Sequence, residues 1–462
     1  MSTDETTAVR ADDAARTEGR RIVLDRHGPE YRTEFVDWAK RLHAGPRIAW
    51  NDTHGGYWFV NGNQELFDVA RRSDVLSNDA DIRNERRGYD GINIPASSKE
   101  TRGGVIGGFL EMDPPVQRYY RNALNAYLSP AAVARWQPVL DEITRAAIDE
   151  KIESGRIDFV EDLANIVPAV LTMALLGLPL EDWVIYNEPS HASVYTPIHS
   201  PDHPRVMELA MQMGMSLFGR IQEAKTDPKP GLLSAVLNAD LGDHQQDDME
   251  AVGVIMLLIG GGFDTTTALT AHSLEWLGEH PDQRERLVRE WDTLRDSATE
   301  EFLRFYTPAQ GDGRTVSADV EIDGVQFKEG DRLWLSWAMA NRDEQVFPDP
   351  HEIKLDRTGN RHASFGLGIH RCIGSNVARA GFKTMVKAVL DRMPDFVCDP
   401  AGTVHYETTQ VINGMRYLPA TFTPGKRLGP GLEETIAKIQ RVVDEQRLAE
   451  PVTVRKERAT LG

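Results

Sequence analysis

The stretch His362-Ala363-Ser364-Phe365-Gly366-Leu367-Gly368-Ile369-His370-Arg371-Cys372-Ile373-Gly374 decides how the rest of this chain is interpreted. Its glycines let the backbone turn tightly and approach a bulky group without a Cβ in the way. Backbone N–H groups freed from regular structure, together with Arg371 and His370, would favour a thiolate at Cys372. The residues after Gly374 follow a helical pattern, and the positive end of that helix would favour the thiolate further. A thiolate held in this way suits a haem iron as its axial ligand.

Other interpretations of this loop fit less well. A dinucleotide-binding loop would need a third glycine where Arg371 stands, and a phosphate-binding loop would need a following Lys-Ser or Lys-Thr. Zinc would need further Cys or His partners, yet the chain has only one other cysteine, Cys398. Because Cys398 has no glycine, histidine or arginine beside it, we interpret it as an inert thiol.

The pattern Phe365-Gly366-x-Gly368-x-His370-x-Cys372-x-Gly374 resembles the cysteine-loop signature of the cytochrome P450 family, the haem-thiolate monooxygenases. This resemblance implies a mainly α fold with a small β-rich part, forming a triangular haem domain around a long central helix. It also implies haem b (iron protoporphyrin IX) as the cofactor, with Cys372 as the metal ligand. The same resemblance places Phe365, Gly366, His370 and Gly374 at the cofactor.

Composition limits the possible functions and the compartment. The chain has 462 residues, of which 40% are hydrophobic, and this suffices for one large domain or two ordinary ones. A net charge of -19 argues against a nucleic-acid partner and against an anionic membrane surface. Two cysteines give no disulfide framework and fit a cytoplasmic protein. No secretory signal is recognisable, and the most apolar stretch, 251–263, is too short to span a bilayer.

We expect one continuous domain with a tail at each end. Residues 1–20 are expected to form a disordered N-terminal tail, residues 21–425 the haem domain, and residues 426–462 a partly helical C-terminal extension. In the extension, an apolar stripe recurs at helical spacing, at Leu432, Ile436, Ile439 and Val443.

A long helix over residues 247–279 is predicted to run through the core, capped by Asp247 or Asp248 and ended near Pro281. Each glycine of Gly260-Gly261-Gly262 costs about 1 kcal/mol relative to alanine inside a helix, so the run suggests close approach to a flat ligand. A kinked packing site against another helix is the alternative. Thr265 can bond back to a carbonyl and open the helical ladder.

The stretch from Gly261 to Thr265 also resembles the oxygen-binding segment of the family. The resemblance implies that Gly261 and Gly262 adjoin the cofactor. It implies further that Asp264 and Thr265 are catalytic, because in the family the acid and the threonine organise water that protonates iron-bound dioxygen.

Two arginines and a histidine match family positions that bond the haem propionates. Arg121 lies on a helix expected to begin near Asp113, and Arg314 precedes a strand-rich run over 320–337. His370 belongs to the cysteine loop. Without the resemblance, we would interpret each of these residues as an ordinary polar residue on the surface.

Glu301 and Arg304 are one helical turn apart and lie between the long helix and the cysteine loop. With Arg357 they match the glutamate–arginine–arginine network of the family. A buried network of this kind is costly unless fully paired, so we expect it to hold the loop of Cys372 in place rather than to add stability.

The resemblance implies hydroxylation of a small or medium apolar organic substrate with dioxygen. Electrons would come from a separate ferredoxin and ferredoxin reductase, docked near a basic patch of Arg118, Arg371, Arg379 and Lys383. The alternatives are a peroxide-driven or isomerising member of the family, or a non-catalytic haem-binding sensor. Residues 84–110, a connection over 183–204 interpreted as mobile, and Val411-Ile412 would shape the substrate pocket.

Overall fold

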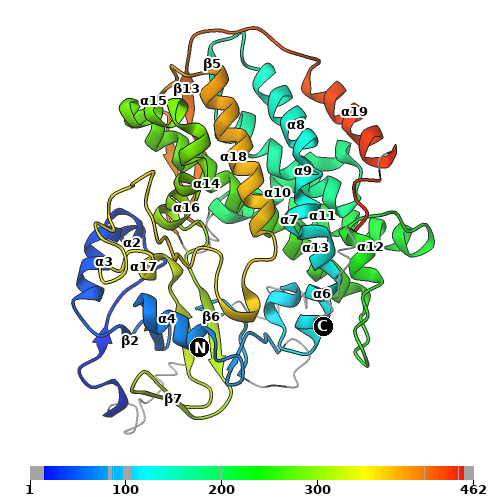
Figure 1. The fold of residues 1–462 in the computed structure, drawn as a ribbon. Coiled ribbons are helices and arrows are strands. Elements are labelled where there is room, and N and C mark those ends of the chain that lie inside the picture. The colour runs from blue at the N-terminus through cyan, green and yellow to red at the C-terminus, as the bar shows by residue number, and fades with distance from the viewer. Residues whose placement is uncertain are drawn as a thin grey trace, which may run out of the picture.

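The computed structural model describes residues 15–81, 86, 88–96, 107–196, 200–409, 412–445 and 447–451. Helices dominate it, and four small sheets accompany them, as the sequence predicts (Figure 1). The sheet of β2 and β6 lies with the N-terminal helices on one side, while β5 and β13 lie with the long helices on the other (Figure 1).

The first part of the chain alternates short strands and helices. Helix α3 leads into the strands β2 and β3, which pair with each other. The bounds are β1 (Arg21–Ile22), α2 (Pro29–Thr33), α3 (Phe35–His43), β2 (Ile48–Asn51), β3 (Tyr57–Val60), α4 (Asn63–Ala70), β4 (Leu76–Ser77) and η1 (Gly108–Glu111). Within the expected N-terminal tail, residues 15–20 are described. Arg16 there donates a 2.7 Å hydrogen bond to Asp331 and Thr17 is buried, so this end of the tail is packed on the body.

The middle of the chain is helical. Its elements are α6 (Val116–Leu128), α7 (Pro130–Ala134), α8 (Gln137–Asp149), β5 (Arg156–Asp158), η2 (Val160–Ala164), α9 (Ile166–Leu176), η3 (Leu180–Asp182), α10 (Trp183–Tyr195), α11 (His203–Thr226) and α12 (Leu232–Leu237). Helix α10 shows that the interpretation of 183–204 as a mobile connection was wrong for residues 183–195. The four prolines of 183–204 suggested an irregular connection, yet α10 accommodates one of them, Pro189, in its interior.

The predicted central helix exists but is divided in two, α13 (Asp248–Gly262) and α14 (Asp264–Glu279), with Phe263 between them. Asp247 caps α13, because its carboxylate accepts a 2.8 Å hydrogen bond from the N–H of Glu250. By length and composition residues 248–279 could cross a membrane, but 61% of their most apolar window is buried inside the protein. A helix that is buried to this extent is typical of a protein core.

The remaining elements frame the cysteine loop. They are α15 (Pro281–Arg289), α16 (Trp291–Tyr306), β6 (Asp312–Val316), β7 (Val320–Ile322), β8 (Val325–Phe327), β9 (Arg332–Leu335), α17 (Trp337–Ala340), η4 (Gly368–His370), α18 (Ser375–Arg392), β10 (Val397–Cys398), β11 (Val404–His405), β12 (Met415–Tyr417), β13 (Pro419–Thr421) and α19 (Leu432–Glu445). The largest sheet has the strand order β1-β2-β3-β9-β6-β4. Strand β3 pairs with β2 antiparallel and with β9 parallel, so segments distant in sequence form one surface.

The C-terminal extension is packed on the helical side of the molecule (Figure 1). Helix α19 contacts α8, α9 and η3, and its predicted stripe faces them, with Ile436, Ile439 and Val443 buried. Gln440 also accepts a 3.0 Å hydrogen bond from the N–H of Leu180 through its side-chain oxygen. The division of the chain at residues 425 and 426 stays a prediction.

Candidate active site

The cysteine loop is a tight turn at the start of α18. The N–H of Cys372 donates a 2.7 Å hydrogen bond to the carbonyl of Phe365, which closes the loop. Gly366 and Gly368 have φ angles of +67° and +68°, in the left-handed region that favours glycine. A Cβ on Gly368 would also lie 2.4 Å from the carbonyl oxygen of Ala70, so no larger residue fits there.

Cys372 is exposed as a residue, while its thiol group is surrounded by protein. Burial raises the pKa of the Cys372 thiol. The N–H of Gly374 and the charges of Arg371 and Arg121 act in the opposite direction, and burial outweighs them. The donors that the sequence predicts around the sulfur are therefore present, and the thiolate state of Cys372 stays a prediction.

The central helix opens where its glycines lie. The hydroxyl of Thr265 donates a 2.9 Å hydrogen bond to the carbonyl of Gly261, as the sequence predicts. A Cβ on Gly261 would meet nothing within 4 Å, whereas one on Gly262 would lie 2.6 Å from the hydroxyl of Thr172 on α9. Gly261 therefore faces open space and Gly262 allows two helices to approach. The packing site is therefore present at Gly262, while the approach of a flat ligand to Gly261 stays a prediction.

Helix α18 joins the cysteine loop to the central helix. It packs against α14, and a Cβ on Gly381 would lie 3.9 Å from the methyl group of Thr266. Because Thr266 follows Thr265 directly, this contact places the loop and the opened helix in one region of the fold. Cofactor contacts of Phe365, Gly366, Gly261, Gly262 and Gly374 stay predictions.

Asp264 lies in a buried polar cluster that the sequence did not reveal. Its carboxylate is 2.6 Å from Nδ1 of His191 on α10 and accepts hydrogen bonds of 3.0 and 3.1 Å from the hydroxyl of Tyr406. The Tyr406 oxygen is also 3.2 Å from Nδ1 of His191, so the three groups contact one another. Burial and the neighbouring carboxylate raise the pKa of Tyr406, which stays a hydrogen-bond donor.

His191 extends this cluster toward the surface. Its Nε2 is buried, has no hydrogen-bond partner among the described residues, and lies 3.9 Å from a carboxylate oxygen of Glu161, whose side chain is 46% exposed. Burial raises the pKa of Glu161. Glu161, His191 and Asp264 thus form a row of polar side chains that leads from solvent to the opened helix.

Two arginines and a histidine gather at the cysteine loop. His370 is close to Arg121 and Arg314, and burial together with these two charges lowers its pKa well below the ordinary value. Within the described part of the chain neither arginine makes an ion pair, and Nδ1 of His370 is buried without a hydrogen-bond partner. The side chain of Arg314 donates to the carbonyl of Gly313, and that of Arg121 to the carbonyl of Arg371. Such a group fits the two carboxylates of a haem.

Glu301, Arg304 and Arg357 form the predicted network. The carboxylate of Glu301 accepts two 2.8 Å hydrogen bonds from Arg304 and one of 2.8 Å from Arg357. Arg304 also donates to the carbonyl of Asn341, whose side-chain oxygen accepts the N–H of Ala363 at 2.7 Å. The network therefore reaches the beginning of the cysteine loop, and its role in holding the loop stays a prediction.

Glu300, the residue before Glu301 on α16, makes a second contact with the cysteine loop. Glu300 accepts hydrogen bonds of 2.6 and 2.7 Å from Arg379 and lies 3.0 Å from Nε2 of His362. These partners lower the pKa of Glu300 to about 2, although burial opposes the shift. The guanidinium of Arg379 in turn lies 4.5 Å from the centre of the Phe365 ring. Sequence reasoning missed Glu300, whose only signal is its place beside Glu301.

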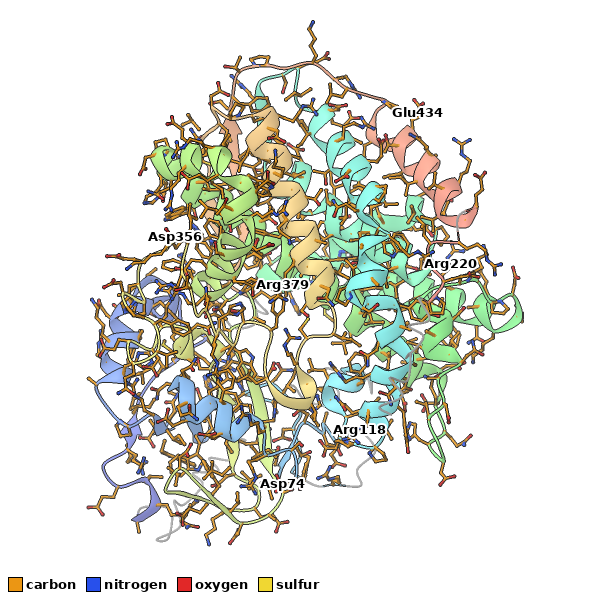
Figure 2. The ribbon with its side chains drawn as sticks, viewed as in Figure 1. Asp74, Arg118, Arg220, Asp356, Arg379 and Glu434 are labelled. Atoms are coloured by element: carbon orange, nitrogen blue, oxygen red, sulfur yellow. The ribbon has the colours of Figure 1, made fainter. Side chains whose placement is uncertain are left out.

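The predicted basic patch is largely neutralised by ion pairs. Arg379 is paired with Glu300, and Lys383 lies 2.8 Å from Asp296. Arg118 on α6 is exposed, and no ion pair involves it among the described residues (Figure 2). A groove of about 690 Å³ runs beside α18, lined by charged residues of both signs that include Arg295, Asp296, Arg379, Lys383 and Lys387.

The regions expected to shape the substrate pocket are only partly described. Residues 86, 88–96 and 107–110 of the 84–110 stretch are described, and η1 begins within it. Val411 lies outside the described residues. Ile412 is buried and forms an isolated antiparallel bridge with Ala309.

Comparison with known proteins agrees with this geometry. A sequence model of the cytochrome P450 family matches residues 197–401. The chain is 28% identical to a steroid C26-monooxygenase of Mycolicibacterium smegmatis over 408 residues, 84% of this chain and 90% of that protein. It is 29% identical to a vitamin D3 dihydroxylase of Streptomyces griseolus over 317 residues, 68% of this chain and 77% of that protein. The crystal structure of CYP109E1 from Bacillus megaterium with testosterone superposes with a TM-score of 0.73, at 28% identity over 85% of this chain and 99% of that one.

Proposed function

Because the chain belongs to the cytochrome P450 family, a family of haem b monooxygenases, we propose that it hydroxylates an apolar substrate of steroid-like size. The size class is supported by two relatives, one named for a steroid and the other for vitamin D3, and by a structural relative that holds testosterone. Partly buried apolar side chains on the central helix, Met256, Leu257 and Leu258, suit such a substrate.

The observation that carries the proposal is the cysteine loop with its cations. Cys372 is an exposed residue, and Arg121 and Arg314 make no ion pair among the described residues. These residues fit haem b, with Cys372 holding the iron, the two guanidinium groups holding the propionates and His370 beside them. Haem bound in this way supplies activation of dioxygen with two electrons, so that one oxygen atom enters a C–H bond and the other leaves as water.

We infer that Asp264 and Thr265 deliver the protons for this reaction. The Thr265 hydroxyl donates to Gly261, so the lone pairs of its oxygen stay free to accept a hydrogen bond from water. Asp264 carries the proton, and His191 returns one to its carboxylate from the solvent side. A rotation of the half-exposed Glu161 side chain would shorten the 3.9 Å gap to His191 and complete the route.

A separate ferredoxin and its reductase are proposed as the source of electrons. The proposed docking surface is the groove beside α18 together with the exposed Arg118 on α6. The protein is proposed to be cytoplasmic.

The test is a panel of steroids and smaller apolar compounds added to the haem-loaded protein. Displacement of iron-bound water shifts the haem absorbance, and we expect this shift with steroids at lower concentrations than with compounds of one or two rings. Turnover with a ferredoxin, its reductase and dioxygen should then give a hydroxylated product. If hydrogen peroxide alone gives product as fast as ferredoxin, reductase and dioxygen do, the peroxide-driven alternative is favoured. Substrate binding without any product would favour the sensor.

A further inference from the structure

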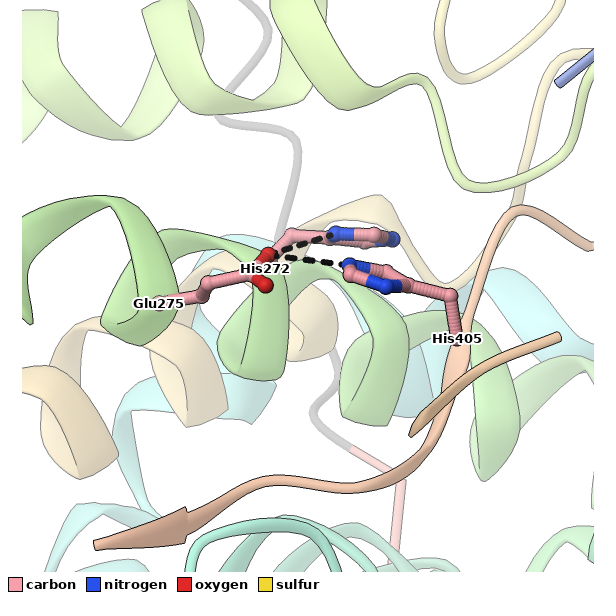
Figure 3. Close-up of side chains that lie close together, drawn as sticks. All are labelled: His272, Glu275 and His405. Atoms are coloured by element: carbon pink, nitrogen blue, oxygen red, sulfur yellow. Dashed lines mark hydrogen bonds and ion pairs between the residues drawn. The ribbon is translucent and has the colours of Figure 1, made fainter. Parts of the chain in front are cut away.

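Two histidines and a glutamate meet between α14 and β11, away from the cysteine loop. Nε2 of His405 lies 3.1 Å from Oε2 of Glu275, and Nδ1 of His272 lies 3.8 Å from the same oxygen (Figure 3). His272 and Glu275 are three residues apart on α14 and so share a face, while His405 comes from the strand. One donor atom from each of these residues lies within 4.8 Å of the other two.

The buried histidine of this group lacks good hydrogen bonds. The side chain of His272 is only 6% exposed, and the 3.8 Å separation at Nδ1 exceeds hydrogen-bonding distance. The backbone of Asn413 lies near the ring, but Nε2 makes no well-formed hydrogen bond with any described residue. A buried imidazole normally satisfies at least one nitrogen well. Figure 3 shows the ring of His272 directed toward the carboxylate that the ring of His405 also faces.

We propose that His272, Glu275 and His405 bind one divalent transition-metal ion, with Zn²⁺ as the best fit. Two imidazole nitrogens and a carboxylate oxygen are a ligand set that zinc accepts with water in the fourth position. With ligand bonds of about 2.0–2.2 Å, the donor atoms of a tetrahedral site lie about 3.4 Å apart. The two measured separations, 3.1 and 3.8 Å, lie on either side of that value.

Binding requires one adjustment. The two imidazole rings are stacked, with centres 5.6 Å apart and planes at 23°, so their lone pairs run nearly parallel. A rotation of His405 about its side-chain bonds would direct both lone pairs at one point. This residue can turn because its side chain is 29% exposed, whereas His272 is also stacked on Tyr306, 4.8 Å between ring centres.

Such an ion would fasten β11 to the central helix beside the catalytic acid. His405 precedes Tyr406, and adjacent residues of an extended chain point to opposite sides. One of them contacts Glu275 and the other contacts Asp264, so the ion would hold the strand that presents Tyr406 to Asp264. The ion is therefore proposed as a structural one that fixes this strand, independently of the substrate and of the electron source.

The zinc content of the protein tests the proposal directly. Haem-loaded protein is equilibrated with Zn²⁺, desalted, and analysed for zinc and iron by mass spectrometry. We expect about one zinc per haem in the parent and in His54→Ala, a control histidine paired with Asp25 at a distant surface. His405→Ala and Glu275→Gln should lose that zinc, while Cys398→Ser, which removes the thiol packed against Gly278, should keep it. Equal zinc in the parent and in His405→Ala, or no zinc in the parent, would overturn the proposal.

X-ray absorption at the zinc edge gives a second, independent readout, because haem iron does not contribute there. The expected signal is two imidazole nitrogens and one or two oxygens at about 2.0–2.1 Å. A sulfur ligand at about 2.3 Å would assign the zinc to a cysteine and contradict the site. Haem absorbance of each variant, unchanged from the parent, shows that the variants have folded.

Discussion

His191 on α10 holds Asp264 on α14 through a 2.6 Å contact between Nδ1 and a carboxylate oxygen. Both side chains are buried, and the free nitrogen of the imidazole lies on the side of Glu161. The carboxylate of Asp264 at the opened helix thus contacts an imidazole whose other nitrogen faces the half-exposed Glu161. This relationship gives the proton for oxygen activation a route made of named groups rather than of water alone.

The first prediction concerns this route. His191→Gln keeps a hydrogen bond to Asp264 but cannot transfer a proton, so product formation should fall, by about 10²-fold if this route carries most protons. The haem spectrum and substrate affinity should stay as in the parent. Product rate is measured against pH, together with the solvent isotope effect. A rate and pH profile equal to those of the parent would exclude His191, and Glu161→Gln, on the exposed side, should lose less than His191→Gln.

Thr265→Ala tests the hydroxyl next to the acid. The variant should bind haem and substrate but divert electrons to hydrogen peroxide, because no hydroxyl remains to hold water at the opened helix. Peroxide and product are counted for each electron pair consumed. Thr265→Ser retains the hydroxyl and should restore the yield. If Thr265→Ala gives the product yield of the parent, Thr265 has no part in proton delivery.

Cys372→Ala tests the proposed iron ligand. This variant should lose the thiolate-type absorbance of the carbon monoxide complex, because no sulfur remains at the loop. Cys398→Ala is the matched control and should keep that absorbance, since Cys398 packs against Gly278 on α14. A thiolate-type spectrum in Cys372→Ala would show that the ligand assignment is wrong.

Much of this site was predictable because its signals are local in sequence. The cysteine loop needs glycine at left-handed positions and a cysteine at a fixed spacing, and Gly366, Gly368 and Cys372 stand in one short stretch. The bond from Thr265 to Gly261 spans one helical turn, so spacing alone suggested it. The core helix followed from an apolar run with a capping aspartate.

The parts that were missed depend on tertiary contacts between distant segments. His191 and Tyr406 are 73 and 142 residues from Asp264, and neither stands in a recognisable motif. The ion pairs within the basic patch were missed for the same reason, because Glu300 and Asp296 on α16 neutralise two of its four members, Arg379 and Lys383.

Glu300 gives a prediction for acid stability. Its pKa is lowered to about 2 in the folded protein, against about 4.3 in an unfolded chain, so its contribution is complete above the unfolded value. That contribution should be lost as the pH falls from about 4.3 toward 2. Urea unfolding of the parent and of Glu300→Gln is compared at several pH values. The parent should be the more stable at pH 7, and the difference should shrink in acid; a difference independent of pH would contradict this assignment.

Arg118 tests the docking of the electron donor. Because Arg379 and Lys383 are engaged with α16, charge reversal is best made at Arg118 alone. Arg118→Glu should slow reduction by an acidic ferredoxin at low salt, and the difference from the parent should narrow as salt rises. Stopped-flow reduction of the haem is the measurement, with Arg205→Glu on α11 as the control. Equal rates at low salt for Arg118→Glu and the parent would place the docking surface elsewhere.

The two adjacent carboxylates of α16 also constrain how this protein can change in evolution. Glu300 is bound to Arg379 and His362 on one side, while Glu301 is bound to Arg304 and Arg357 on the other. Deleting one residue of α16 before them would rotate both by about 100° and move them along the axis by about 1.5 Å. Neither carboxylate could then reach its partners, so insertions and deletions should be excluded from this helix and confined to connections such as the one between α11 and α12.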